Sequence, residues 1–259
     1  MLIAFALACA LFFGTAFAQV SSRDQLRFIV QRLCLTNWRL TGDPAPCMRL
    51  SANASGSDAQ AFALLADRKG GAHLLLIPLA TIAGIESSVV RAPGAFNFFE
   101  AAWQARDALA RTVGYTPPRA AIGMAVNPVH GRSQDQLHIH IACLSPAVYG
   151  ALQTDAPKLS TGWSTIRIGG AQYEALRIMG SELDQHNPFE LLAMHLAHAD
   201  DATMGGHTLL LAGMSFKGGP GFVLLTGEHV PAAELLLDGS CAVLHGTLDQ
   251  PASRRALQR

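Results

Sequence analysis

A pair of histidines occupies the stretch 136–143, whose sequence is QLHIHIAC. Apolar and polar residues alternate there, which predicts a strand that buries its leucine and isoleucines and turns its polar side chains to the opposite face. His138 and His140 would then stand roughly 6–7 Å apart on one face, the advance of two strand residues. Imidazole is a nucleophile and a proton carrier near neutral pH, so this spacing favours a catalytic site with these two residues at its centre.

The connection before this strand, residues 127–135, reads NPVHGRSQD. A glycine, an arginine and a serine offer backbone amides, a guanidinium and a hydroxyl, the groups that bind an anionic phosphate. An ordinary polar hairpin loop is the competing interpretation. If the loop binds phosphate, the contacts to a phosphate or nucleotide are expected from Asn127, Gly131, Arg132, Ser133 and Gln136.

Composition sets broad bounds on the class of protein. The chain has 259 residues, half of them hydrophobic, which is enough for one large or two coupled domains with a full core. Lysine plus arginine and aspartate plus glutamate both number 19, so no basic excess points to nucleic acid. Charged residues are sparse at 15%, a composition that tolerates contact with a membrane surface.

The first 18 residues carry no charged side chain and close with Ala16-Phe17-Ala18. An apolar run that ends in this small-x-small pattern resembles a signal peptide cleaved before Gln19. The run is too short to span a bilayer comfortably, although an uncleaved N-terminal anchor is the alternative. We expect a protein of the cell envelope, in the periplasm or on the periplasmic side of the inner membrane.

Four cysteines remain after that segment: Cys34, Cys47, Cys143 and Cys241. An even number in an exported chain predicts two disulfides, for which three pairings exist. The first two flank a proline-rich turn and are natural partners, which leaves the other two for each other. A zinc site made by all four competes with this interpretation, but no C-x-x-C spacing supports it.

Hydrophobic periodicity and turn residues predict the remaining elements in the first 150 residues. They are a helix over 21–35, a polar link over 51–58, strands over 61–65 and 73–77 around the turn 67–71, a helix over 97–113, and a strand over 120–126. Asn97 and Glu100 form a capping-box pattern at the start of the second helix. Pro78 ends the second strand because proline has no N–H to donate.

Beyond residue 150 the pattern predicts a helix over 181–199 interrupted at Asn187-Pro188, and a hairpin of strands over 208–214 and 221–226. This half is expected to extend and cover the sheet; whether it repeats the first half stays open. The fold class is α+β, an antiparallel sheet with a packed helix plus a C-terminal α/β extension. We divide the chain into a leader (1–18), an N-terminal helix and cysteine loop (19–58), a catalytic core (59–150) and the extension (151–259). The terminal arginines at 254, 255 and 259 are expected to belong to a loose tail.

Two motifs in this sequence resemble known proteins. The run Gly131-x-Ser133-(x)2-Gln136-Leu137-His138-Ile139-His140-Ile141 resembles the histidine triad superfamily, whose motif follows a small phosphate-binding loop. More narrowly, the run NFFEAAWQARD at 97–107, taken with that strand and the four cysteines, resembles the CDP-diacylglycerol pyrophosphatase family. The resemblance extends from about Cys34 to Cys241.

The resemblance implies a HIT-like sheet and hydrolysis of CDP-diacylglycerol to CMP and phosphatidate at a membrane surface. It gives His138 the attack on the α-phosphorus, and His140 the phosphate oxygens and help with proton delivery. Gln136 replaces the first histidine of the triad and is not a general acid, although its amide could donate to a phosphate oxygen. No acidic cluster suited to magnesium stands near the motif, so we expect catalysis without metal or cofactor.

Two alternatives belong to other classes of function. A zinc hydrolase could use the His-x-His pair as two ligands and take a third from His195 or His198, spaced i,i+3. The ordinary interpretation of those two histidines is a solvated helix edge. A nucleotide- or lipid-binding module of the envelope, without turnover, is the other alternative, and the missing third histidine of the triad favours it.

Overall fold

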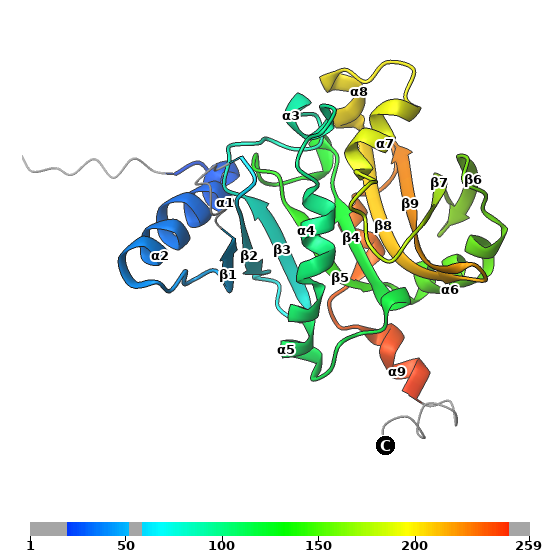
Figure 1. Ribbon diagram of the computed structural model, residues 1–259, viewed down its shortest axis with the longest axis horizontal. Helices are drawn as coiled ribbons and strands as arrows, with labels where there is room; N and C mark the ends of the chain where they lie inside the picture. The colour runs from blue at the N-terminus through cyan, green and yellow to red at the C-terminus, as the bar shows by residue number, and fades with distance from the viewer. Residues whose placement is uncertain (1–19, 52–58, 249–259) are drawn as a thin grey trace, which may run out of the picture.

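The computed structural model describes residues 20–51 and 59–248, and Figure 1 shows its arrangement. The predicted leader, nearly all of the predicted polar link and the terminal arginines lie outside these residues. Within the described part, no helix is both long and apolar enough to cross a bilayer.

One ten-stranded antiparallel sheet organises the described chain, in the order β1-β2-β3-β5-β4-β8-β9-β7-β6, with β10 paired to β5. The α+β class is therefore confirmed, and the C-terminal half extends this same sheet. The strands are β1 (Arg49–Ser51), β2 (Phe62–Ala66), β3 (His73–Pro78), β4 (Ile122–Val126), β5 (Ile139–Leu144), β6 (Ser164–Ile168), β7 (Ala171–Met179), β8 (His207–Phe216), β9 (Gly219–Glu228) and β10 (Leu237–Asp238).

Helices lie on both faces of the sheet. The α-helices are α1 (Gln25–Phe28), α2 (Leu35–Thr41), α3 (Ser88–Arg91), α4 (Phe98–Ala105), α5 (Ala110–Val113), α6 (Pro146–Asp155), α7 (Pro188–His195), α8 (Asp201–Gly206) and α9 (Ala242–Leu248). Short 3-10 turns include η5 (Val129–Gly131) and η7 (Ala233–Leu236). In Figure 1, α4 and α7 lie over one face, where their apolar side chains share a core with alternate residues of the strands. The other face has two separate cores, one under α1 and α2 and one under α6.

The two halves of the chain repeat one topology. The succession β2-β3-α4-β4-β5 recurs as β6-β7-α7-β8-β9, and the central pair β4–β8 joins the two halves. Both long helices begin with an asparagine cap, and their second residues, Phe99 and Phe189, pack with ring centroids 5.1 Å apart. The β9 strand, which takes the place of β5, contains no histidine. The duplication left open by the sequence is therefore a feature of the fold, with histidines on one copy of the strand.

The N-terminal helix is longer than predicted. A helical run of 3-10, α and π turns extends from Ser22 to Thr41 and ends where Gly42 adopts a left-handed φ of 78°. Leu26, Val30 and Cys34 recur at steps of four and are buried against β2 and β3. The apolar stripe was therefore predicted correctly, while the end of the helix depends on a glycine further along the chain.

The predicted helix over 97–113 is broken into α4, a 3-10 turn and α5. Asn97 caps it as predicted, with its side-chain oxygen accepting from the N–H of Glu100 at 3.1 Å. The reciprocal half of the capping box is missing, because the Glu100 carboxylate accepts from the N–H of Leu183 at 2.6 Å instead. The carboxylate thus joins the two halves of the molecule.

The helix predicted over 181–199 is wrong in its first part. Residues 181–187 form no helix, and α7 begins at Pro188, which Asn187 caps through its side chain. Proline fits the first turn of a helix because its missing N–H would have no partner there. The predicted hairpin is confirmed and is longer, as β8 and β9 each have ten residues.

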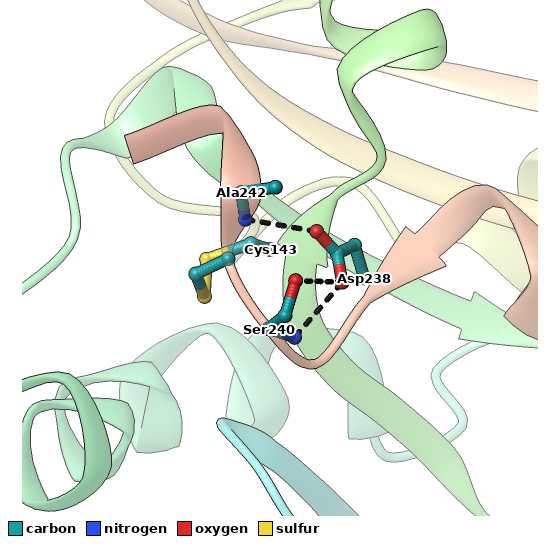
Figure 2. Close-up of a disulfide and its surroundings, with 5 residues drawn as sticks. Cys143, Asp238, Ser240 and Ala242 are labelled. Carbon is teal, nitrogen blue, oxygen red and sulfur yellow. Dashed lines mark hydrogen bonds between the residues drawn. A yellow bond between two sulfur atoms is a disulfide. The ribbon is translucent and has the colours of Figure 1, made fainter. Parts of the chain in front are cut away.

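The chain returns from the second half to the first in its last described segment. Both predicted disulfides are present, Cys34–Cys47 and Cys143–Cys241. Figure 2 shows the second of them beside a turn in which the Asp238 carboxylate accepts from Ser240 and Ala242. Because β10 also pairs with β5, this segment is fixed beside the histidine strand by hydrogen bonds and by a covalent bond.

Candidate active site

A pocket of about 330 Å³ opens on the face of the sheet that α4 and α7 leave free. The N-terminal helix, the β2–β3 turn, the loop before β5 and η7 form its walls. Its lining residues are Gln25, Leu26, Ile29, Pro46, Leu65, Ala66, Asp67, Arg68, Lys69, Leu75, Asn127, Gly131, Ser133, Gln134, His138, His140 and Glu234. One wall is therefore apolar, and the opposite side carries the histidines and charged groups.

His138 is held in one tautomer by the backbone. The residue lies just before β5, so the strand begins three residues later than predicted, yet the alternation continues through Leu137 into the core. The Nδ1 atom of His138 lies 2.7 Å from the carbonyl oxygen of Gln136. A carbonyl only accepts, so Nδ1 carries the proton and the Nε2 atom keeps its lone pair. The unprotonated Nε2 is therefore the ring atom that could act as a nucleophile.

His140 belongs to a chain of four polar side chains. Its Nδ1 lies 3.0 Å from Nε2 of His73, which is a diagonal neighbour on the adjacent strand β3. On the other side, Nε2 of His140 lies 3.3 Å from a carboxylate oxygen of Glu234. The Nδ1 of His73 in turn lies 3.8 Å from a carboxylate oxygen of Asp67. The order is therefore carboxylate, imidazole, imidazole, carboxylate.

These four side chains make three polar contacts but have only two ring protons to share among them. Two neutral imidazoles carry one N–H each, whereas three nitrogen–oxygen or nitrogen–nitrogen contacts would each need one. One of the two ends is then left without a proton, in keeping with the absence of a well-aligned hydrogen bond at the buried Nε2 of His140. A proton received at the Glu234 end can pass to the Asp67 end when both imidazoles exchange tautomers.

Burial lowers the pKa of all three histidines. Loss of hydration is the largest cause for His73, His138 and His140, and the positive charge that a neighbouring histidine would carry lowers the pKa of His140 further. The carboxylates Asp67 and Glu234 oppose the shift at His73 without reversing it. The imidazoles are therefore neutral near neutral pH, the state required of a nucleophile and of a proton acceptor.

The loop before β5 brings three of its predicted residues to the pocket: Asn127, Gly131 and Ser133. The side-chain oxygen of Asn127 accepts from the N–H of Glu234 at 3.0 Å, which joins the loop to η7. Gly131 allows a close approach there, because a Cβ atom would lie 3.1 Å from Cδ of Pro128 and 3.2 Å from Cβ of Ala232. The loop thus supports the segment that carries Glu234 as well as lining the pocket.

Arg132 does not line this pocket and instead borders a small cavity beside it, together with Asn127, Gln136 and His138. Its guanidinium makes a bidentate ion pair with Glu86 at 2.6 and 2.7 Å and a further contact with Asp135 at 3.2 Å. Arg23 of the N-terminal helix binds the same Asp135 side chain and, by that hydrogen bond first of all, lowers the pKa of Asp135 to about 2. These ion pairs fix the loop between the sheet and the N-terminal helix.

Gln136 has no free N–H for a phosphate. Its amide nitrogen donates to the carbonyls of Pro78 and Ala80, at 2.9 and 2.8 Å. It thereby ties the end of β3 to the start of β5, and its backbone carbonyl fixes His138. Gln136 therefore holds His138 in position through its backbone carbonyl instead of contacting a ligand with its amide nitrogen.

Five pocket or near-pocket residues were not predicted from the sequence as site residues: Asp67, Arg68, Lys69, His73 and Glu234. The first three lie in the β2–β3 turn, where a run of polar residues is expected for structural reasons alone. A histidine at the start of an otherwise apolar strand was the one available signal for His73. Glu234 has no local motif, because only the return of the chain to β5 brings it to the site.

Three groups in the site could hold a metal ion. Among the described residues, one ligand atom each from Asp67, His73 and His140 lies within 4.8 Å of the others. His195, proposed from the sequence as a third ligand, instead pairs with Glu174 and stacks on Trp163. His198 is exposed, and α7 covers the opposite face of the sheet, so neither histidine joins the His-x-His pair.

A comparison with known protein families gives a match over nearly all of the described residues. A family model described as CDP-diacylglycerol pyrophosphatase matches residues 21–245. The match covers both halves of the sheet, both disulfides and every residue of the pocket.

Proposed function

The chain belongs to the CDP-diacylglycerol pyrophosphatase family, and we propose that the His138 pocket carries out this hydrolysis in two covalent steps. The protein is a hydrolase of phospholipid metabolism that cleaves CDP-diacylglycerol to CMP and phosphatidate. The single observation that carries the mechanism is the hydrogen bond from Nδ1 of His138 to Gln136, which leaves Nε2 unprotonated.

In the first step, Nε2 of His138 attacks the α-phosphorus of the substrate. A nitrogen–phosphorus bond forms, the bond from that phosphorus to the bridging oxygen breaks, and phosphatidate leaves with the bond's electron pair. A phosphate ester is a weak base, so this departure needs little acid catalysis. The Nδ1 proton stays on the ring, and the Gln136 carbonyl stabilises the positive charge that the ring acquires.

In the second step, water attacks the same phosphorus. Its proton passes to the Glu234 and His140 end of the four-residue chain, the nitrogen–phosphorus bond breaks, and its electron pair returns to Nε2. CMP is released and the histidine is restored. Glu234 supports this role because it lines the pocket and lies 3.3 Å from His140.

The charged phosphates require donors, for which we propose Ser133, the Gly131 backbone and Asn127 from the loop, with Lys69 and Arg68 from the β2–β3 turn. Lys69 supports this role because it lines the pocket with its ammonium 3.4 Å from Glu234. Fixed donors around a phosphoryl group stabilise the charge that develops in the transition state.

Finer assignments of origin and place are also proposals. We propose that the protein is bacterial, that its sheet is HIT-like, and that it acts at the membrane surface of the cell envelope. The apolar leader and the two disulfides support an exported location, because disulfides persist in oxidising compartments.

Hydrolysis in water enriched with the heavy oxygen isotope 18O tests this proposal. Attack at the α-phosphorus places the isotope in CMP, whereas attack at the other phosphorus places it in phosphatidate. Label found in phosphatidate would overturn the covalent route through His138. A parallel incubation with a chelator tests the zinc-hydrolase alternative, since the proposed route keeps full activity after chelation.

A further inference from the structure

We infer that the exposed side of the N-terminal helix is the surface with which the protein docks on an anionic phospholipid bilayer. The residues that form this docking ridge are Phe28, Arg32, Leu33, Trp38, Arg39 and Leu40. The inference rests on the proposed action at a membrane, and it identifies the part of the molecule that makes the contact.

Exposed apolar side chains are concentrated on this helix. Of the ten exposed large apolar side chains in the described part of the chain, five lie between residues 20 and 40. Leu40 is 77% exposed, and Phe28 and Trp38 are 40% and 37% exposed. The helix already buries a separate stripe against the sheet, so these side chains are not needed for the core. A helix that buries one apolar stripe in the core and keeps further large apolar side chains in solvent offers apolar surface to a second partner.

The charge of the segment fits an anionic surface. Residues 20–50 contain five arginines and two aspartates, although the whole chain has no net charge. Arg23 and Arg27 are used in ion pairs with Asp135 and Asp24, whereas Arg32 and Arg39 are exposed and have no ion pair among the described residues. Arginine near the bilayer surface gains about 1 kcal/mol each from anionic lipids, and aromatic and leucine side chains insert beside it.

The position of the ridge beside the pocket identifies a lipid bilayer as the partner. Gln25, Leu26 and Ile29 of the same helix line the pocket. A pocket of about 330 Å³ is at the lower end of ligand-site volumes, so it takes the head group and leaves both acyl chains outside. A bilayer that contacts the ridge keeps those chains in hydrocarbon while the pyrophosphate reaches His138.

Vesicle sedimentation tests the docking ridge directly. The double variant Phe28→Ser/Leu40→Ser should bind vesicles of phosphatidylcholine and phosphatidylglycerol at least about tenfold more weakly than the parent protein, because it loses the apolar area that the two side chains would bury in the bilayer. The control Val89→Ser/Met194→Ser removes two apolar side chains of α3 and α7 that are somewhat more exposed than the ridge pair, and it should bind as the parent does. All variants keep residues 1–19, so any contribution of that segment is common to them.

Two further measurements separate this inference from the proposed function. Brominated lipids should quench the fluorescence of Trp38, and the Trp38→Phe variant should lose that quenching. The other two tryptophans lie away from the ridge: Trp103 is fully buried, and Trp163 is half-buried and stacks on His195. Arg32→Gln/Arg39→Gln should reduce binding to anionic vesicles and leave binding to neutral vesicles unchanged. Each ridge variant should hydrolyse a soluble short-chain CDP-diacylglycerol at the parent rate.

The outcomes lead to different conclusions. Equal vesicle binding by the ridge variant and its control would overturn the docking ridge. Unquenched Trp38 fluorescence in the vesicle-bound protein would do the same. In either case the exposed residues would serve a protein partner. Failure of the parent protein to hydrolyse the soluble substrate would overturn the proposed function and leave the vesicle result standing.

Discussion

His140 and Glu234 are brought together from different halves of the molecule, with Nε2 and a carboxylate oxygen 3.3 Å apart. The histidine belongs to the first copy of the repeated topology, and the carboxylate belongs to the segment that follows the second copy. In the proposed mechanism, the first copy supplies the nucleophile His138 together with His140, and the returning segment supplies Glu234, which takes part in accepting the proton of water.

The first prediction concerns that division. Glu234→Gln keeps the size of the side chain and removes its basicity, so the second step should slow by about 10²–10⁴ while the first remains fast. Rapid mixing should then show a burst of phosphatidate equal to the enzyme concentration, and a nucleotide should accumulate on His138. Equal slowing of both products, without a burst, would contradict the assignment of Glu234 to the second step.

The nucleophile itself is tested by His138→Ala. Turnover should fall by roughly 10³ or more, because of the two described histidines that line the pocket only His138 has its Nδ1 bound to a backbone carbonyl. His140→Ala should be damaging but less complete, and only His138→Ala should abolish the acid-labile nucleotide adduct. Circular dichroism of both variants is the control for folding. Near-normal activity of a folded His138→Ala protein would refute the covalent mechanism.

Much of this site follows from the sequence because it is local. The alternation at 136–143, the loop before it and the cysteine count all express short-range rules, and they predicted the strand, His138, His140 and both disulfides. Asp67 and Glu234 could not be predicted in the same way, since their roles depend on which strand lies next to β5 and on the return of the chain through β10. The interruption at Asn187-Pro188 was predicted, whereas the break in the 97–113 helix and the absence of helix over 181–187 were missed. Tertiary contacts such as that of Glu100 with Leu183 are not visible in a local pattern.

Lys69, which lines the pocket, and Arg132, which lies in ion pairs beside it, should behave differently when substituted. Lys69→Gln should raise KM more than it lowers kcat, since its side chain lines the pocket and is solvent-accessible. Arg132→Gln should instead lower the free energy of unfolding by about 3 kcal/mol, because it leaves the Glu86 carboxylate without its buried partner. Urea denaturation and steady-state kinetics on both variants check this. A stable Arg132→Gln protein with a raised KM would return Arg132 to the phosphate site.

The pH dependence follows from burial of the histidines. A lowered pKa keeps His138 neutral below the ordinary value of 6.5, so the acidic limb of kcat/KM should lie below pH 6.5. The free energy of unfolding should also decrease on acidification. The histidines of the unfolded chain take up protons near pH 6.5, whereas those of the folded chain do so only at lower pH, so the stabilisation is greatest above pH 6.5. The slope is about 1.4 kcal/mol per pH unit for each histidine affected. A profile with its acidic limb above pH 6.5, or stability that rises on acidification, would contradict the buried neutral state.

The disulfide between Cys143 and Cys241 has a consequence for the order in which the enzyme becomes active. A chain synthesised from its N-terminus presents His138 before Glu234 and Cys241. Under the proposed mechanism, a product that stops before η7 would have the nucleophile without Glu234 and would stall after its first substrate molecule. The disulfide fixes the segment after η7 beside β5, so repeated turnover would require the chain to extend at least to Cys241.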